Sequence, residues 1–288
     1  MIFRNGLKLQ LDIKVYGFCP FDVKEIYQSE GLHTHRHLKG DYTIQIIDGD
    51  KTVYITDFAG TQTFNKLPRN STIVVQNNEI TYCKENIEIS SLYYKPPQGL
   101  KPRNTYDELF QAIDDAVRLR CVDNPWITMS SGHDSGVIVA SALSQGLQFS
   151  TLSVKAKEDM RVLDQRLKLT EGVLIDECDN TKDAHQVTAE SLGAPWRSCK
   201  TLLLGLGADE YFDTRDYQLA TTFFRESSHY YKSHGIELRY PLLDPHVFFM
   251  YHILEPQLKD RNKKPLRKYM QSKNFPYRKK EKIPFYLK

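Results

Sequence analysis

Hydrophobic and polar residues alternate through the first third of the chain. The alternating runs are 42–47 (YTIQII), 52–56 (TVYIT), 71–75 (STIVV) and 79–82 (EITY). The first two flank the acidic turn 48–50 (DGD), and the last two flank Asn77-Asn78. Turns of this kind between two β-rich runs are typical of β-hairpins. The pattern therefore predicts a small, mainly antiparallel β region within residues 1–95.

A proline-rich segment then interrupts the pattern. Residues 95–102 are KPPQGLKP, and three prolines with a glycine continue neither a helix nor a central strand. We therefore expect a linker at residues 96–104. From Thr105 the hydrophobic spacing becomes helical, because Thr105 and Glu108 match a capping box and apolar residues follow at intervals of three and four.

Short apolar strands and helices alternate through the rest of the chain. Strands are predicted at 126–129, 149–154 and 201–204, and a helix at 137–143. Strands that alternate with helices favour a parallel, doubly wound sheet. The predicted fold class is α/β, with this parallel sheet in residues 105–288 preceded by the mainly antiparallel β region.

The segment that joins the first of these strands to the helix has the composition of a phosphate-binding loop. Residues 130–136 are SSGHDSG. Ligands of open α/β sheets bind at the carboxyl ends of strands, where small residues let backbone N–H groups approach phosphate oxygens. Asp134 would repel a phosphate unless a divalent cation bridges them, so we interpret it as a Mg²⁺ ligand. The loop is neither a Walker loop nor GxGxxG, and a plain helix N-cap with incidental serines is the alternative.

Four segments in sequence order resemble the asparagine synthetase family. Residues 130–136 are similar to the SGGxDS pyrophosphate loop of ATP-pyrophosphatases, with Ser131 where that motif usually has glycine. The runs similar to the family's SGEGADELF, GxExRxPFLD and RxKE are LGLGADEYF at 204–212, GIELRYPLLD at 235–244 and RKKE at 278–281. The resemblance covers nearly all of residues 126–285, and it implies a trimmed PP-loop ATP-pyrophosphatase domain.

The resemblance implies a reaction and a set of site residues. The family activates a carboxylate by attack on the α-phosphate of ATP, releases pyrophosphate, and forms an amide when an amine attacks the acyl-adenylate. Asp134 and Asp209 are implied to hold Mg²⁺. Lys280 is implied to neutralise the phosphates during transfer, and Glu237 with Arg239 to line the site. The implied ATP-binding residues are Met129, Ser130, Ser131, Gly132, His133, Asp134, Ser135, Val154 and Gly205.

Several of these residues also have a plainer interpretation. Asp209 could belong to an ordinary acidic helix N-terminus, which the helix dipole favours. Glu237 and Arg239 could form a local surface ion pair of little energetic worth. Lys280 lies in a basic stretch, because residues 259–288 contain 12 Lys and Arg against 2 acids, so a solvated or nucleic-acid-binding tail is its alternative.

The chain also departs from the family at two places. Leu206 stands where the family has a glutamate that is expected to take part in the amine-attack step, and a leucine cannot accept a proton. Residues 40–61 resemble the N-terminal glutaminase domain, which needs a cysteine as its first mature residue. No cysteine precedes Cys19 here. We therefore expect residues 1–95 to be a truncated glutaminase-like region that does not hydrolyse glutamine.

Composition narrows the class of protein. Hydrophobic residues make up 40% and aromatic residues 11%, so a packed core is expected. The formal net charge of +3 is too small for a general nucleic-acid coat. No run approaches the roughly 18 apolar residues of a membrane span. The five cysteines are scattered and form no CxxC pair, so we expect reduced thiols in the cytoplasm.

The predicted function is an ATP-dependent amide-forming ligase of the asparagine synthetase type, with ATP and Mg²⁺ as cofactors and aspartate or an analogue as the acid. An intramolecular ligase like β-lactam synthetase or a lasso-peptide cyclase also fits, and Leu206 favours that kind. The alternatives are a PP-loop enzyme that modifies tRNA or nucleobases, and an inactive ATP-binding protein. The expected partners are small-molecule carboxylate and amine substrates, without membrane or nucleic acid and with a homodimer left open.

Overall fold

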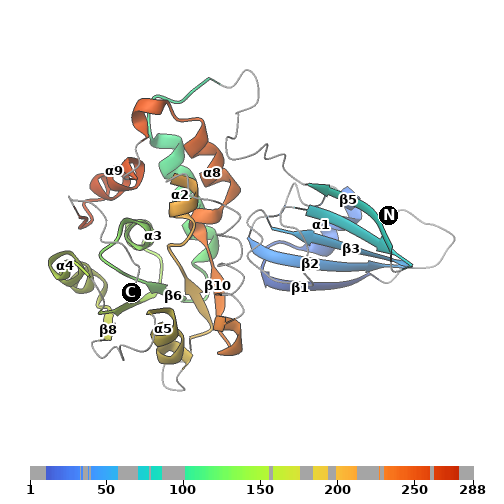
Figure 1. The fold of residues 1–288 in the computed structure, drawn as a ribbon, viewed down its shortest axis with the longest axis horizontal. Coiled ribbons are helices and arrows are strands. Elements are labelled where there is room, and N and C mark those ends of the chain that lie inside the picture. The colour runs from blue at the N-terminus through green and yellow to red at the C-terminus, as the bar shows by residue number, and fades with distance from the viewer. Residues whose placement is uncertain are drawn as a thin grey trace. The chain divides into compact units, whose positions relative to one another are not determined.

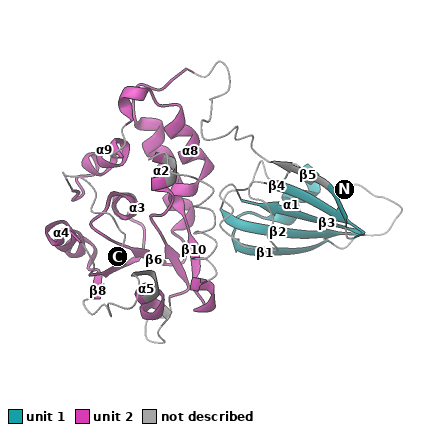
Figure 2. Ribbon diagram, in the orientation of Figure 1, with its two compact units in different colours: residues 1–90, 221–229 teal, residues 91–220, 230–288 magenta. Residues whose placement is uncertain are grey.

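The structure is a computed structural model with two compact units. It describes residues 11–32, 34, 38, 40–57, 71–77, 79–85, 101–155, 158–175, 184–193, 199–212, 227, 230–259 and 263–278. One unit comprises Met1–Ser90 with Thr221–His229, and the other Ser91–Ala220 with Tyr230–Lys288 (Figure 2). The predicted linker therefore falls inside the second unit, and its residues 96–100 lie outside the described part of the chain.

The described part of the first unit contains an antiparallel sheet and the helix α1 (Figure 1). The elements are β1 (Asp12–Phe18), α1 (Val23–Glu30), β2 (Asp41–Asp48), β3 (Lys51–Thr56), β4 (Ser71–Gln76) and β5 (Glu79–Glu85). The strands pair in chain order from β1 to β5. Both predicted hairpins are confirmed, with Gly49 at φ 64° in the β2–β3 turn and Asn77 at φ 53° after β4. These are the residue types that tolerate positive φ in hairpin turns.

The predicted alternation of β2 and β3 builds the core of the first unit. Ile44, Ile46 and Ile55 are fully buried. Tyr42 and Val53 join them, and Val23 of α1 packs on the same cluster. Successive side chains of a strand point to opposite faces, so every second residue reaches this core. The hydrophobic period of two is therefore explained by one sheet face that a helix covers.

The second unit is built on a parallel sheet of five strands with the order β10-β9-β6-β7-β8 (Figure 1). The strands are β6 (Trp126–Thr128), β7 (Ser150–Val154), β8 (Val173–Ile175), β9 (Thr201–Leu203) and β10 (Glu237–Arg239). The three predicted strands correspond to β6, β7 and β9, and the predicted helix lies within α3 (His133–Ser144). The short β8 and β10 were not predicted. The α/β class is confirmed at the level of one antiparallel and one separate parallel sheet.

The order of the parallel strands reverses at β6. From β6 the chain adds β7 and β8 on one side, and it then returns to add β9 and β10 on the other side. The β6–β9 pair is therefore the point from which the connections leave in opposite directions. In open α/β sheets, ligands bind outside the carboxyl ends of the strands at such a point. The loops that follow β6 and β9 are thus the first place to look for a site.

Helices of the second unit pack around this sheet. They are α2 (Asp107–Arg120), α4 (Met160–Thr170), α5 (Ala184–Gly193), α6 (Ala208–Phe212), α8 (Pro245–His252) and α9 (Lys264–Ser272), with 3₁₀ turns η2 (Pro241–Leu243) and η3 (Pro256–Leu258). The central α3 is buried along Ser135–Ala142 because other elements surround it. Helix α2 packs against α3 and α8, and α9 packs against α3. No helix in the described part of the chain has the length and hydropathy that a membrane span needs.

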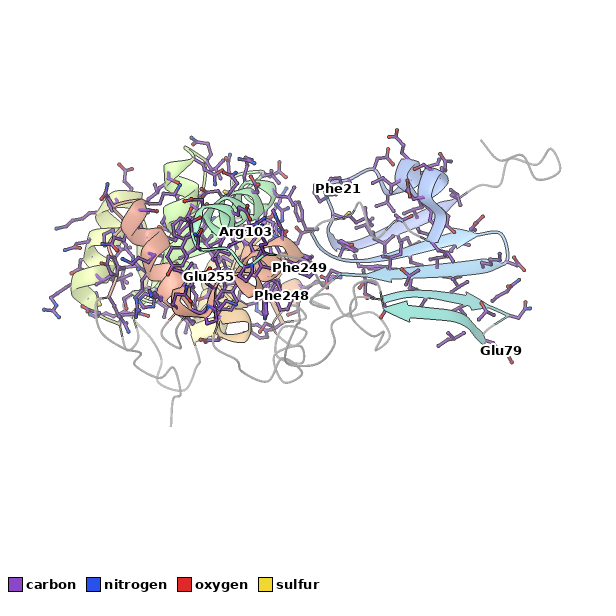
Figure 3. All side chains as sticks on the ribbon, turned by 90° about the horizontal axis from the view of Figure 1, so that it is seen from above. Phe21, Glu79, Arg103, Phe248, Phe249 and Glu255 are labelled. Carbon is purple, nitrogen blue, oxygen red and sulfur yellow. The ribbon has the colours of Figure 1, made fainter. Side chains whose placement is uncertain are left out.

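The predicted capping box of α2 is wrong. The helix is present, but its N-cap residue is Tyr106 and no side chain caps it. Glu108 instead accepts a hydrogen bond from Arg103 Nε at 2.6 Å. Arg103 itself lies beside the end of α8, since its carbonyl accepts the backbone N–H of Glu255 at 2.9 Å (Figure 3). A charged partner outside the helix thus replaces the local capping interaction.

A buried ion pair joins α2 to the start of α8. Arg120 is fully buried, and its Nη1 lies 2.9 Å from Asp244 Oδ2. The other carboxylate oxygen of Asp244 caps α8 by accepting the backbone N–H of His246 at 2.9 Å. Arg239 of β10 donates to the Arg120 carbonyl oxygen at 2.8 Å. One buried carboxylate and two arginines therefore connect a helix, an edge strand and the next helix.

We predict that removal of the Asp244 carboxylate strongly destabilises the second unit. Asp244→Ala leaves a buried guanidinium without its charge partner and uncaps α8, so the free energy of unfolding should fall by about 3–5 kcal/mol. Urea denaturation followed by tryptophan fluorescence measures this, because both tryptophans belong to the second unit. Asp115→Ala breaks an ion pair whose side chains are 57% and 35% exposed, and it should cost under about 1 kcal/mol. Equal losses in the two variants would contradict the prediction.

Candidate functional site

Hydrogen bonds between serines set the shape of the loop that joins β6 to α3. Ser135 Oγ accepts the backbone N–H of Ser130 at 3.0 Å and lies 2.8 Å from Ser130 Oγ. Ser130 Oγ also accepts the backbone N–H of Gly132, which is the N-cap of α3, at 3.1 Å. Two of the serines that the resemblance implies to bind ATP are therefore engaged in hydrogen bonds within the loop. The strand side is fixed by the buried Met129, whose N–H donates to the carbonyl of Leu152 at 2.8 Å.

Gly205 brings the loop after β9 against the start of α3. A Cβ atom on Gly205 would lie 2.5 Å from the nitrogen of Ser135 and 2.7 Å from the carbonyl carbon of Asp134. Neither backbone atom can move aside as the end of a flexible side chain can. The close approach therefore requires glycine at position 205. It also carries Asp209, four residues further on, toward the nucleotide-binding loop predicted around Asp134.

The carboxylates of Asp134 and Asp209 converge on one cation, the ammonium group of Lys263. Lys263 Nζ lies 2.6 Å from both oxygens of Asp134 and 2.6 Å from Oδ1 of Asp209. Burial by itself lowers the pKa of Lys263, but the two carboxylates outweigh burial and raise the pKa above its ordinary value. Lys263 therefore stays charged. The sequence predicted that these aspartates share a cation, but it did not predict the lysine.

The same two carboxylates fit a magnesium ion. Mg²⁺ in nucleotide sites is commonly held by one or two carboxylates, with phosphates and water completing the shell. Asp134 and Asp209 supply that number, and their oxygens already face one cation-sized point. Among the described residues there is no group of three or more His, Cys, Asp or Glu that could hold a metal ion. A magnesium ion at Asp134 and Asp209 would therefore need phosphate or water ligands as well. A metal at this point competes with the Lys263 ammonium.

Ser131 lies at the centre of a second charged cluster. Its backbone N–H donates to Glu158 Oε2 at 2.6 Å, and its fully buried hydroxyl also donates to that carboxylate. The hydroxyl accepts the backbone N–H of Asp159 at 3.0 Å and a hydrogen bond from Arg278. Arg278 Nη2 lies 3.4 Å from the Glu158 carboxylate. A hydroxyl at position 131 therefore has a structural role that glycine could not supply.

Arg166 of α4 lies under the loop as a fully buried cation. Its Nη1 donates to the carbonyl oxygen of Ser130 and, at 2.8 Å, to that of Gly132. Its Nε donates to the carbonyl oxygen of Pro276 at 2.9 Å. Burial lowers the pKa of Arg166 to about 9, a shift that Glu158 opposes and Arg278 reinforces. The guanidinium remains charged at neutral pH.

His133 binds the same C-terminal stretch of the chain. Its Nε2 lies 3.3 Å from the carbonyl oxygen of Arg278, so the nitrogen carries the proton that this bond needs. Burial lowers the pKa of His133 despite that hydrogen bond and the nearby Asp134 carboxylate. A neutral imidazole is therefore expected at pH 7. This contact makes His133 a bridge between the loop and residue 278.

The other predicted site residues lie apart from the loop or outside the described residues. Glu237 and Arg239 pair with each other at 2.8 Å on β10, and strand β9 separates them from β6. Arg239 also holds the end of α2, as described above, so the structure explains this pair by packing. Val154 ends β7, the strand next to β6. Lys280 lies outside the described part of the chain.

Three site residues were missed by the sequence reasoning: Lys263, Arg166 and Glu158. Arg278 was placed in the run that resembles RxKE, but no role was predicted for it. The basic composition of residues 259–288 hinted at Lys263 and Arg278, but many cations there share that property. No protein-family model matches the chain, and no curated protein matches it in sequence.

We predict that Lys263→Met increases the affinity of the site for a divalent cation in the absence of nucleotide. The substitution keeps the length of the side chain and leaves two neighbouring carboxylates without a cation, so Mn²⁺ should bind at least about tenfold more tightly. Titration with Mn²⁺, followed by the electron paramagnetic resonance of the free ion, measures this affinity. Lys264→Met is the control, because it removes a neighbouring charge that binds the carbonyl oxygen of Gln257 instead of the two aspartates. Equal Mn²⁺ affinity in wild type and Lys263→Met would show that the ammonium does not hold the cation position.

Proposed function

We propose that the protein is an ATP-dependent, AMP-forming amide ligase of the asparagine synthetase type, with a PP-loop, doubly wound second unit. One observation carries the proposal. Asp134 follows β6 and Asp209 follows β9, and their carboxylates meet at one cation position where the strand order reverses. That is the place where an open α/β sheet binds its ligand. Two separated sequence segments of the family resemblance are thereby joined at one point.

The chain's own groups suit a bound triphosphate. The start of α3 presents backbone N–H groups and the positive end of its dipole toward anions. A magnesium ion held by Asp134 and Asp209 would neutralise phosphate charge. Without a metal, the ammonium group of Lys263 occupies this position. When Mg²⁺ takes the position, Lys263 can turn its ammonium group to a phosphate oxygen. No Walker lysine is present in the loop, so we place cleavage between the α- and β-phosphates rather than at the γ-phosphate.

The nitrogen donor in this proposal is a free or substrate-borne amine rather than glutamine. Glutamine hydrolysis of the family type needs a reactive thiolate. Burial raises the pKa of Cys19, Cys121 and Cys199 to about 11 in each case, which makes these described thiols poor nucleophiles. We propose that the first unit is a glutaminase-like remnant with a structural role. Free thiols also suit a cytoplasmic location.

The chemistry at Leu206 favours a substrate that brings its own amine. Leu206 lies between the closely packed Gly205 and the positive-φ Gly207, in the loop that delivers Asp209. A leucine there cannot deprotonate an incoming ammonium ion. An amine that is already neutral or is held by the substrate avoids this need. An intramolecular ligase related to β-lactam synthetase or a lasso-peptide cyclase is therefore the second candidate.

We predict that the enzyme with Mg²⁺, ATP and its cognate acid produces AMP and pyrophosphate. A pyrophosphate-release screen over a panel of carboxylates, with the nucleotide products separated by chromatography, tests this. Asp134→Asn should lower the rate and the dependence on Mg²⁺ together, because it removes a charge that the cation needs. Asp164→Asn, an exposed aspartate on α4, is the control and should change neither.

Other products would overturn the proposal in different ways. ADP and phosphate would exclude the family chemistry. Turnover only with RNA, together with salt-dependent RNA binding, would favour a tRNA-modifying or nucleobase-modifying PP-loop enzyme. ATP binding without pyrophosphate release for any acid would indicate an inactive binding protein.

We predict a specific catalytic role for Lys280 within the basic C-terminal stretch. A preorganised cation that meets charge as it develops is worth about 2.7–4 kcal/mol, so Lys280→Ala should slow turnover roughly 10²–10³-fold. The affinity for ATP should change little, because the contact strengthens in the transition state. Lys279→Ala and Lys282→Ala remove the same charge nearby and serve as controls in steady-state kinetics. Equal slowing by all three substitutions would indicate a general electrostatic surface instead.

A further inference from the structure

We propose that Arg166 is a positioning residue that couples the nucleotide loop to the C-terminal segment Phe275–Arg278, so that the two respond to a bound nucleotide as one unit. The coupling is a property of the described contacts. Its use in catalysis rests on the proposed function, because Lys280 follows this segment by two residues.

One guanidinium holds both segments at once. Arg166 donates to the carbonyl oxygens of Ser130 and Gly132 in the loop and to that of Pro276 in the C-terminal segment. Its guanidinium carbon also lies 5.1 Å from the ring centroid of Phe275. These carbonyls come from positions that are 36, 34 and 110 residues away from Arg166 along the chain. A lysine has one donor group on a flexible stem and cannot make this planar, three-way contact.

The first helical turn of α3 leaves room for the guanidinium. A Cβ atom on Gly136 would lie 2.5–2.8 Å from three atoms of the Arg166 guanidinium. Glycine at position 136 and arginine at position 166 are therefore matched in shape. A charged guanidinium occupies the space under the loop. An apolar side chain could fill the same space, so packing alone does not explain an arginine there.

The contacts of Arg166 also fix the direction of the loop amides. In a planar trans peptide, the carbonyl of one residue and the N–H of the next point in opposite directions. Because the carbonyls of Ser130 and Gly132 face Arg166, the N–H groups of Ser131 and His133 face away from it. The Ser131 N–H follows this rule, since it donates to the Glu158 carboxylate. Arg166 thus fixes the direction of these two N–H groups, and Glu158 already occupies that of Ser131.

A second connection runs beside the first. Arg278 binds the Ser131 hydroxyl and the Glu158 carboxylate, and its backbone carbonyl binds His133. The Nε of Arg278 is buried and finds no hydrogen-bond acceptor among the described residues. Both ends of the C-terminal segment are therefore attached to the loop, through Pro276 on one side and Arg278 on the other. A displacement of the loop must displace the segment as well.

Hydrogen exchange of the full-length protein, followed by mass spectrometry, tests the coupling. The variants are Arg166→Lys and Arg278→Lys, and the control is Arg161→Lys on the same helix, whose side chain is 92% exposed. Arg278→Lys should speed exchange in residues 129–136 at least about tenfold, and Arg166→Lys should speed it there and in residues 270–278. Arg161→Lys should change neither. In the wild type, Mg²⁺ with ATP should slow exchange in both segments, and in Arg166→Lys it should slow exchange in the loop alone.

Each result has a defined meaning. Unchanged loop exchange in Arg278→Lys would overturn the coupling, and so would protection of the wild-type loop by ATP with residues 270–278 unaffected. A purely structural role for Arg166 would lower thermal stability without separating the two ATP responses. If Arg278→Lys loosens the loop but ATP protects neither segment of the wild type, the coupling stands and the proposed nucleotide function fails. Arg278→Lys keeps the test valid even if Arg166→Lys does not fold.

Discussion

Two carboxylates that face the same point repel each other unless a cation lies between them, and the second unit is arranged around that constraint. The close approach of Gly205 to α3 brings the loops after β6 and β9 together. The carboxylates of Asp134 and Asp209 then face one point, and Lys263 supplies a positive charge there, at 2.6 Å from each. Lys263 has a left-handed backbone, φ 55°, immediately before α9. The start of that helix is therefore tied to the sheet ends through one ammonium group.

Buried cations recur as the means by which distant segments are joined in this unit. Arg166 joins the loop to the C-terminal segment, and Arg120 joins α2 to the cap of α8. Each of these side chains is costly to bury, because a charge loses its hydration in the interior. Loss of the partner of a buried charge destabilises the fold by more than the intact pair stabilises it. Such pairs therefore favour one packing arrangement over others.

The same arrangement limits the chemistry that the site can perform. The described groups can hold a cation between two carboxylates and fix the direction of the loop amides. A proton acceptor for an incoming amine is lacking at Leu206, and the described cysteines are too weakly acidic to act as nucleophiles. The high pKa values of these thiols argue against glutamine hydrolysis at the described cysteines. The proposed ligase therefore takes its amine from another source.

The amino-acid sequence by itself determined the local elements. The period of two predicted β2 to β5, short apolar runs predicted β6, β7 and β9, and small residues after β6 predicted the loop, because these patterns depend only on neighbours along the chain. The sequence did not predict β1, β8 and β10. The strands β6 and β9 are as short as β8 and β10, but they lie within the four-residue runs 126–129 and 201–204 that the pattern did reveal. Tertiary structure alone decided which charge meets Asp134: Lys263 is 129 residues away, in a stretch with many equivalent cations. Tertiary structure also paired Glu108 with Arg103 in place of the predicted capping box, and it brought Glu158 and Arg278 to Ser131. Such contacts form between segments that only packing of the sheet and helices brings together, so no local pattern records them.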